Sequence, residues 1–88
     1  IIGVTISRET KEIVAQTDCQ TRGFVYLKDS QYLINQIVQI CESCVSLLAE
    51  NPDMDVNEVR MIMKDQSMKY ISRETGKRPV FIPVIIEI

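Results

Sequence analysis

The last nine residues restrict the fold of this chain more than any other stretch. Between Val80 and Ile88, every residue except Glu87 is apolar. Successive side chains of a strand point to opposite faces. One face would carry the β-branched set Val80, Ile82, Val84, Ile86 and Ile88, and the other would carry Phe81, Pro83, Ile85 and Glu87. Such a run is typical of a buried strand, so the rest of the chain has to cover it.

Two further strands are predicted near the beginning of the chain. Ile1–Ile6 and Glu12–Thr17 both alternate between the two faces of a strand, and the polar connector between them has the length of a hairpin turn. They are predicted to pair as an antiparallel hairpin. Asp18–Gly23 then reads as a polar loop, and Phe24–Leu27 as a short extended segment that could continue the sheet.

Two helices are predicted between these strands and the last one. Gln31–Glu50, capped by Asp29 or Ser30, places its apolar residues on one continuous half of a helix, as in a helix that lies on a sheet. Asp55, with an acidic residue three positions later, forms the capping-box pattern. The second helix is predicted to run from there to about Glu74, with Gly76 just beyond its end.

The predicted order is β-β-α-α-β, which defines an α+β fold: a small three-stranded β-sheet covered on one face by two α-helices. Pro83 lacks an N–H group and favours an edge position or a bulge for that half of the last strand. Two helices cover one face only, so Phe81, Pro83 and Ile85 are expected on the uncovered face. Such an apolar patch is typical of a contact with another domain or subunit. The alternative is that the loop around Asp18–Leu27 folds over these side chains.

Charged and sulfur-containing residues suggest two weaker candidate surfaces. Arg73, Lys77 and Arg78 gather near the end of the second helix, where they either complement the helix dipole or contact phosphate groups. Arg22 could belong to the same surface. The net charge of −2 argues against binding nucleic acid by bulk electrostatics. Met61 and Met68 lie on the polar side of the second helix, as partner contacts or as merely exposed side chains.

No catalytic, cofactor-binding or metal-binding residue is predicted. The chain has three cysteines and no histidine, and a tetrahedral zinc site needs four ligands. Cys41 and Cys44 fall on the apolar half of the first helix and are expected to be buried small side chains. Three cysteines form no complete disulfide framework, which favours the reducing cytoplasm. No apolar run approaches the roughly 20 residues that span a membrane.

Two stretches, in order and at the right distance, resemble the C-terminal domain of ribonuclease J. The first is Thr21-Arg22-Gly23-Phe24-Val25-Tyr26. The second is Glu74-Thr75-Gly76-Lys77-Arg78-Pro79, followed by the apolar strand. The sequence departs from the family at Thr17–Thr21, where the usual apolar pair is lost. Some bacteria have two ribonuclease J paralogues that form a mixed complex, and this departure favours the second, weakly active one.

The resemblance implies a role for the chain within a larger enzyme. Ribonuclease J is a bacterial metallo-β-lactamase and β-CASP nuclease with 5′-to-3′ exoribonuclease and endoribonuclease activity, which acts in RNA processing and mRNA decay. Its zinc ligands lie upstream of the C-terminal domain, so residues 1–88 are expected to be one domain cut from a longer chain. The C-terminal domain supports subunit assembly and full activity. The implied partners are a second or paralogous subunit, the upstream catalytic domains and, through the whole enzyme, RNA.

Three functions therefore compete at this point. The first is an assembly domain that docks through the face carrying Phe81 and Ile85. The second is an RNA-binding module that presents substrate through Arg22, Arg73, Lys77 and Arg78. The third disregards the resemblance and is a small regulatory module that binds a metabolite, although the sequence shows no residues for such a pocket.

Overall fold

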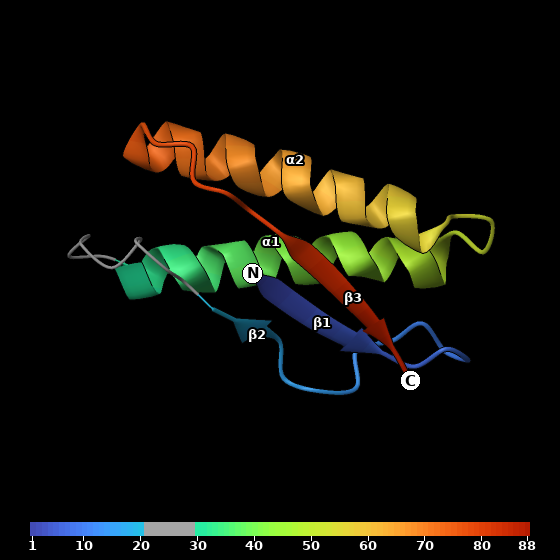
Figure 1. The fold of residues 1–88 in the computed structure, drawn as a ribbon. Helices are drawn as coiled ribbons and strands as arrows, with labels where there is room; N and C mark the ends of the chain where they lie inside the picture. Colours follow the sequence, from blue (N-terminus) through green and yellow to red (C-terminus); the bar gives the residue numbers. More distant parts are fainter. Residues whose placement is uncertain (21–29) are drawn as a thin grey trace.

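The computed structural model describes residues 1–20 and 30–88 and has the predicted α+β architecture (Figure 1). Two helices and three strands form in the order β1 (Ile2–Ile6), β2 (Asp18–Cys19), α1 (Ser30–Glu50), α2 (Val56–Thr75) and β3 (Pro83–Glu87). The helices form an antiparallel pair that packs against one face of the mixed sheet, and β3 crosses in front of α1 in Figure 1. Residues Phe24–Leu27, predicted to be extended, lie outside the described residues.

The first strand lies at the centre of the sheet, between β2 and β3. It pairs in parallel with β3 over five residues, from Ile2 opposite Pro83 to Ile6 opposite Glu87. The ladder opens with the Ile2 N–H, which donates to the Ile82 carbonyl at 3.0 Å. The last strand is therefore an edge strand, as the missing N–H of Pro83 predicts.

The predicted antiparallel pairing with the first strand is confirmed, but most of it forms at other residues than those predicted. The strand expected at Glu12–Thr17 is reduced to one antiparallel bridge between Ile6 and Ile13. Antiparallel pairing resumes at β2, within the segment expected to be a polar loop. Ile13 and Val14 remain 37% and 51% exposed. Because Thr17 alone is buried in the predicted strand, cross-strand packing cannot hold a longer ladder there.

Both helices form where their terminal signals place them. The first begins at Ser30, one residue before the predicted start. At the start of α2, the Asp55 carboxylate accepts a hydrogen bond from the Asn57 N–H at 2.6 Å. Gly76 adopts a left-handed conformation with φ of 69° beyond the end of α2, and its N–H donates to the Ser72 carbonyl at 2.8 Å. The N-cap and the glycine terminator are thus confirmed.

The core lies between the sheet and the two helices. The first helix contributes the apolar half predicted from its sequence. The buried core residues are Ile2, Val4, Ile6, Ile37, Cys41, Cys44, Val45, Leu48, Val59, Met63 and Ile71. The second helix buries Val59, Met63, Ser67 and Ile71. Ser67 fits there because its hydroxyl lies 3.6 Å from the Cys41 sulfur.

The two faces of β3 are reversed relative to the sequence prediction. Phe81 and Ile85 pack against the core, and Pro83 is buried. The opposite set, which was expected under the helices, is exposed. The reversal follows from the register, because Ile85 lies beside Val4 on the helix-covered side of the sheet. The prediction that one apolar face of the sheet is left uncovered is therefore confirmed. The prediction that Phe81 and Ile85 form that face is wrong.

Candidate interaction surfaces

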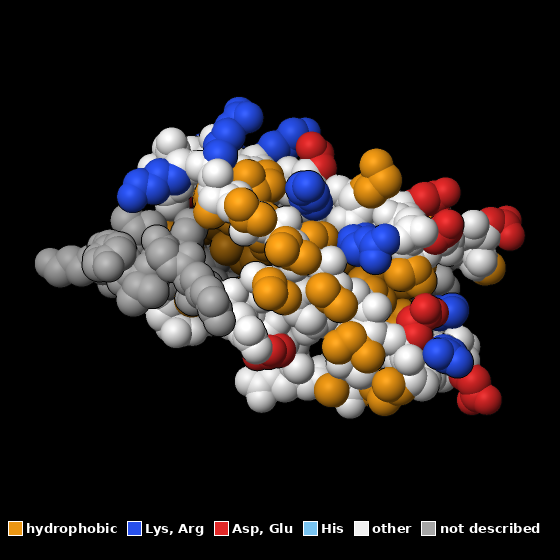
Figure 2. All heavy atoms as spheres, in the orientation of Figure 1, with side chains coloured by type: hydrophobic (Ala, Val, Ile, Leu, Met, Phe, Trp, Pro, Cys, Tyr) orange, Lys and Arg blue, Asp and Glu red, His pale blue; other side chains and the backbone are white. Residues whose placement is uncertain are grey.

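The sheet surface that faces away from the helices is apolar along β3. We call it the outer face, and its residues are Val80, Ile82, Val84, Ile86 and Ile88, with exposures of 86%, 47%, 36%, 46% and 69%. Ile1 adds a side chain that is 56% exposed. Figure 2 shows hydrophobic side chains gathered on this side of the molecule. The sheet therefore presents a row of branched side chains to its surroundings.

Small residues of β1 leave the outer face flat. Gly3 lies opposite Val84 in the parallel ladder, and Thr5 lies opposite Ile86. A Cβ atom at Gly3 would lie 3.9 Å from Cδ1 of Ile86, which is ordinary van der Waals contact. The Ile86 side chain therefore extends over the space beside Gly3. A flat, branched surface of this kind packs well against another apolar surface.

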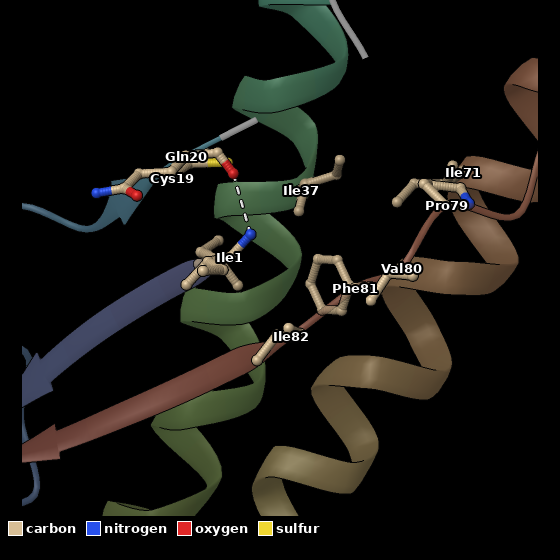
Figure 3. A pocket seen from close by; sticks show the side chains of 10 residues that line it. Ile1, Cys19, Gln20, Ile37, Ile71, Pro79, Val80, Phe81 and Ile82 are labelled. Carbon is tan, nitrogen blue, oxygen red and sulfur yellow. Dashed lines mark hydrogen bonds between the residues drawn. The ribbon is translucent and has the colours of Figure 1, made fainter. Parts of the chain in front are cut away.

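An apolar groove of about 660 Å³ continues from the outer face toward the helices (Figure 3). Val80 and Ile82 belong to both surfaces, and the Phe81 ring points into the groove between α1 and the start of β3. The Ile1 backbone nitrogen donates to the Gln20 carbonyl at 3.0 Å on the opposite wall. The sequence did not reveal this groove, because its walls come from the start of β1, the end of α2 and the approach to β3.

The two candidate methionines lie in different environments. Met61 is 71% exposed on α2. Met68 lies seven residues further along the same helix. It is partly buried and lines a second depression with Lys69 and Arg73. Only Met61 is thus a freely exposed side chain, and the predicted contact role of both residues stays a prediction.

Basic side chains surround that second depression, which has a volume of about 440 Å³. Lys69 and Arg73 come from α2, and Arg78 comes from the segment that leads into β3. Asp65, Met68 and Ser72 complete the lining. The structure thus brings together Arg73 and Arg78, two of the four basic candidates, and adds Lys69, which the sequence analysis missed.

The remaining two basic candidates are not placed at this depression. Lys77 follows Gly76 in sequence, and its backbone N–H donates to the Thr75 hydroxyl at 3.1 Å. Its side chain is not among those that line the depression. Arg22 lies outside the described residues.

Cys41 and Cys44 are buried in the core, as their position on the apolar half of α1 predicts. Burial raises the pKa of the Cys41 thiol to about 11, against the opposing effect of its contact with Ser67. Burial also raises the pKa of the Cys44 thiol, which lies 3.5 Å from the Gln66 Oε1 atom. In residues 1–20 and 30–88, no three His, Cys, Asp or Glu side chains gather as metal ligands. Both cysteines are therefore neutral packing groups at neutral pH.

We expect the Cys41 thiol to resist alkylation in the folded chain until the pH rises well above 9. The thiolate is the reactive species, and the folded-state pKa of about 11 exceeds the ordinary value of 9.0. Stability from the neutral thiol is complete below about pH 9 and is lost as the pH rises toward 11. Peptide mapping by mass spectrometry after iodoacetamide treatment should show partly buried Cys19 modified first. Equal rates for Cys19 and Cys41 in the folded chain would contradict the assignment.

The first helix is long and apolar enough, by length and composition, to cross a membrane. In the structure, however, Leu33, Ile37 and Val45 are buried against the rest of the domain. Its opposite side is polar, with Asn35, Gln39 and Ser43 exposed. This is the pattern of an amphipathic core helix, and the compact domain is consistent with a soluble one.

The fold and its surfaces define a small α+β domain with an apolar sheet face and a separate basic depression. The chain belongs to the ribonuclease J C-terminal domain family, whose model matches residues 1–88. This confirms the family resemblance seen in the sequence.

Individual relatives agree with the family match. Ribonuclease J 2 of Staphylococcus saprophyticus is 34% identical over 85 residues, which cover 97% of this chain and 15% of that protein. Ribonuclease J2 of Bacillus subtilis is 28% identical and Ribonuclease J 2 of Streptococcus pyogenes is 27% identical, each over 88 residues that cover 100% of this chain and 16% of the relative. The chain thus spans about one sixth of the length of these relatives.

Proposed function

We propose that this chain is the assembly and support domain of a bacterial ribonuclease J, which acts in the cytoplasm in RNA processing and mRNA decay. Its outer face would pack against a second or paralogous ribonuclease J subunit and thereby promote full activity. The observation that carries the proposal is that five apolar side chains, one at every second position from Val80 to Ile88, are exposed on the outer face. Continuous apolar patches of this kind are rare on monomers and mark contact sites.

The geometry favours a protein surface as the occupant of the outer face. Its side chains are held by a strand whose opposite side is packed into the core through Phe81 and Ile85. Such a rigid surface loses little conformational freedom on binding. The adjoining groove would admit a projecting side chain of the partner, as expected for the centre of an interface. The catalytic chemistry, including zinc binding, would belong to the part of the enzyme beyond this chain.

The relatives favour the second paralogue as the parent of this domain. The three relatives above are named Ribonuclease J 2 or J2. We therefore propose that the partner subunit is a copy of the same protein or its paralogue. Full activity of the enzyme would then depend on subunit assembly. The side chains of this domain would take no part in the cleavage of RNA.

Light scattering of the 88-residue chain over a wide concentration range tests the assembly role. The unmodified chain should reach the mass of a dimer as its concentration rises. The double variant Val84→Asp/Ile86→Asp should remain a monomer, because pairing would bury two carboxylates without partners. The matched control Gln39→Asp/Ser43→Asp adds the same charge on the exposed side of α1 and should still dimerise.

The same two variants should be compared in the full-length nuclease that carries this domain. We expect the outer-face variant to reduce both the oligomer mass and the RNA-degrading activity, whereas the α1 control preserves them. An unchanged oligomer mass in the outer-face variant would refute the assembly role.

A further inference from the structure

We propose that the basic depression at the end of α2 binds the phosphodiester backbone of single-stranded RNA. The inference rests on the proposed function for the identity of the polyanion, because the parent would be a ribonuclease. It concerns a different surface, however: the depression is lined by residues of α2 and by Arg78, whereas the outer face belongs to β3. Assembly and RNA binding can therefore fail independently.

Charge is distributed very unevenly along the chain. Residues 64–78 contain five Lys or Arg and two Asp or Glu, which gives them a net charge of +3. The other residues contain five basic and ten acidic side chains, so they carry −5 and bring the whole chain to −2. Residues 42–58 are acidic throughout, with five carboxylates and no basic residue. Figure 2 shows a group of blue side chains at the upper left and most of the red ones toward the right, where further blue side chains lie among them.

Because the acidic and basic residues are separated, the net negative charge of the whole chain does not describe the charge around the basic depression. The molecule extends 39 Å along its longest axis. Salt at physiological strength screens exposed charges beyond about 8 Å. A phosphate in the basic depression would therefore respond mainly to the local charges, which are Lys69, Arg73 and Arg78 together with the paired carboxylates of Asp65 and Glu74. The acidic turn between the helices would act on it only weakly.

The side chains at the depression can exchange their present partners for phosphate. Lys69 pairs with Asp65 at 3.1 Å, and Arg73 pairs with Glu74 at 3.6 Å. Both pairs are well exposed to solvent, so they are weak and readily exchanged. The guanidinium group of Arg73 also lies 5.7 Å from the centre of the Tyr70 ring, which favours one orientation of the group. Arg78 pairs with none of the acidic side chains that the structure describes.

A favourable interaction with the dipole of α2 does not explain all three basic side chains of the depression. A cation near the last turn, such as Arg73, has that effect. Lys69 lies a turn earlier, and Arg78 lies beyond the Gly76 cap in the segment before β3. These two segments converge on one hollow, which Ser72 also lines. Convergent cations around a hollow are suited to successive phosphates, and arginine can bind a phosphate in a bidentate manner.

The test measures the fluorescence anisotropy of a labelled single-stranded oligouridine of about 12 nucleotides, a length within the usual range of single-strand sites. We expect the 88-residue chain to bind it at low salt. Three phosphate contacts predict a slope of about −2 for the logarithm of affinity against that of salt concentration. Affinity should then fall about 16-fold between 50 and 200 mM salt, given that slope.

Two charge-matched double variants locate the site. Arg73→Gln/Arg78→Gln should lower the affinity by about tenfold or more and flatten the salt slope, because two of three phosphate contacts are lost. Arg8→Gln/Arg60→Gln removes the same charge from exposed positions outside the depression and should change the affinity by less than about twofold. Circular dichroism should show that both variants keep the fold.

Three outcomes would overturn the proposal. They are the absence of RNA binding at low salt, an equal loss of affinity in both double variants, and displacement of the RNA by polyglutamate at an equal concentration of charge. The last result would assign the depression to an acidic protein surface. The oligomer mass, measured on the same samples, reports on the assembly role separately.

Discussion

Replacing Met63 by alanine should lower the free energy of unfolding by about 2–5 kcal/mol. Met63 is fully buried in α2 and belongs to the core between the helices and the sheet. The truncation removes apolar contacts and leaves a cavity that the surrounding side chains fill only in part. A domain of this size has a total stability of about 4–13 kcal/mol. The variant should therefore lose a large share of its stability.

Met61 provides a matched control on the same helix. It has the same side chain, but 71% of its surface is exposed. Met61→Ala should change the free energy of unfolding by no more than about 0.5 kcal/mol, because an exposed side chain leaves no cavity. Urea denaturation followed by circular dichroism measures both values. Similar losses for the two variants would contradict the position of α2 in the structure.

A second large effect is expected from Ile85→Asp, which should leave the chain mostly unfolded near 25 °C. Ile85 is partly buried, packs against the core and lies beside Val4, which has no exposed surface. The change removes apolar packing and places a carboxylate against the apolar side chains of the core. The combined loss is several kcal/mol, comparable with the total stability of a small domain.

The neighbouring substitution, Ile86→Asp, should leave the domain folded. Ile86 lies on the outer face and is 46% exposed, so its replacement should cost less than about 1 kcal/mol. Circular dichroism and urea denaturation of both variants measure which face of β3 is buried. A folded Ile85→Asp variant beside an unfolded Ile86→Asp variant would show that the face assignment is wrong. The experiment also establishes that outer-face variants are suitable for testing assembly.

Local sequence signals were sufficient to predict the helices. The apolar half of Gln31–Glu50 is the half that packs into the domain, because a helix with such a broad apolar side has only one way to bury it. Asp55 and Gly76 mark the ends of α2 through hydrogen bonds within their own neighbourhood. Signals of this kind depend on a few adjacent residues, so the rest of the fold does not change them.

The candidate surfaces were less predictable, because they depend on contacts between distant segments. Arg73 and Arg78 were predicted, with Lys77, to form a basic group because they are close in sequence. Lys77 does not line the depression, and Lys69 joins the two arginines only in the folded chain. The apolar groove combines Ile1, Phe81 and Ile71, which no local pattern connects. Such sites arise from packing and have no sequence period.

The sequence by itself determined the α+β class, the two helices, the edge position of β3 and the family. The tertiary structure alone decided which face of β3 is buried. Both faces of that strand are apolar, and a period of two residues does not say which set faces the helices. The parallel register with β1 settles the choice by placing Ile85 beside Val4 over the core, and it leaves Val84 and Ile86 exposed.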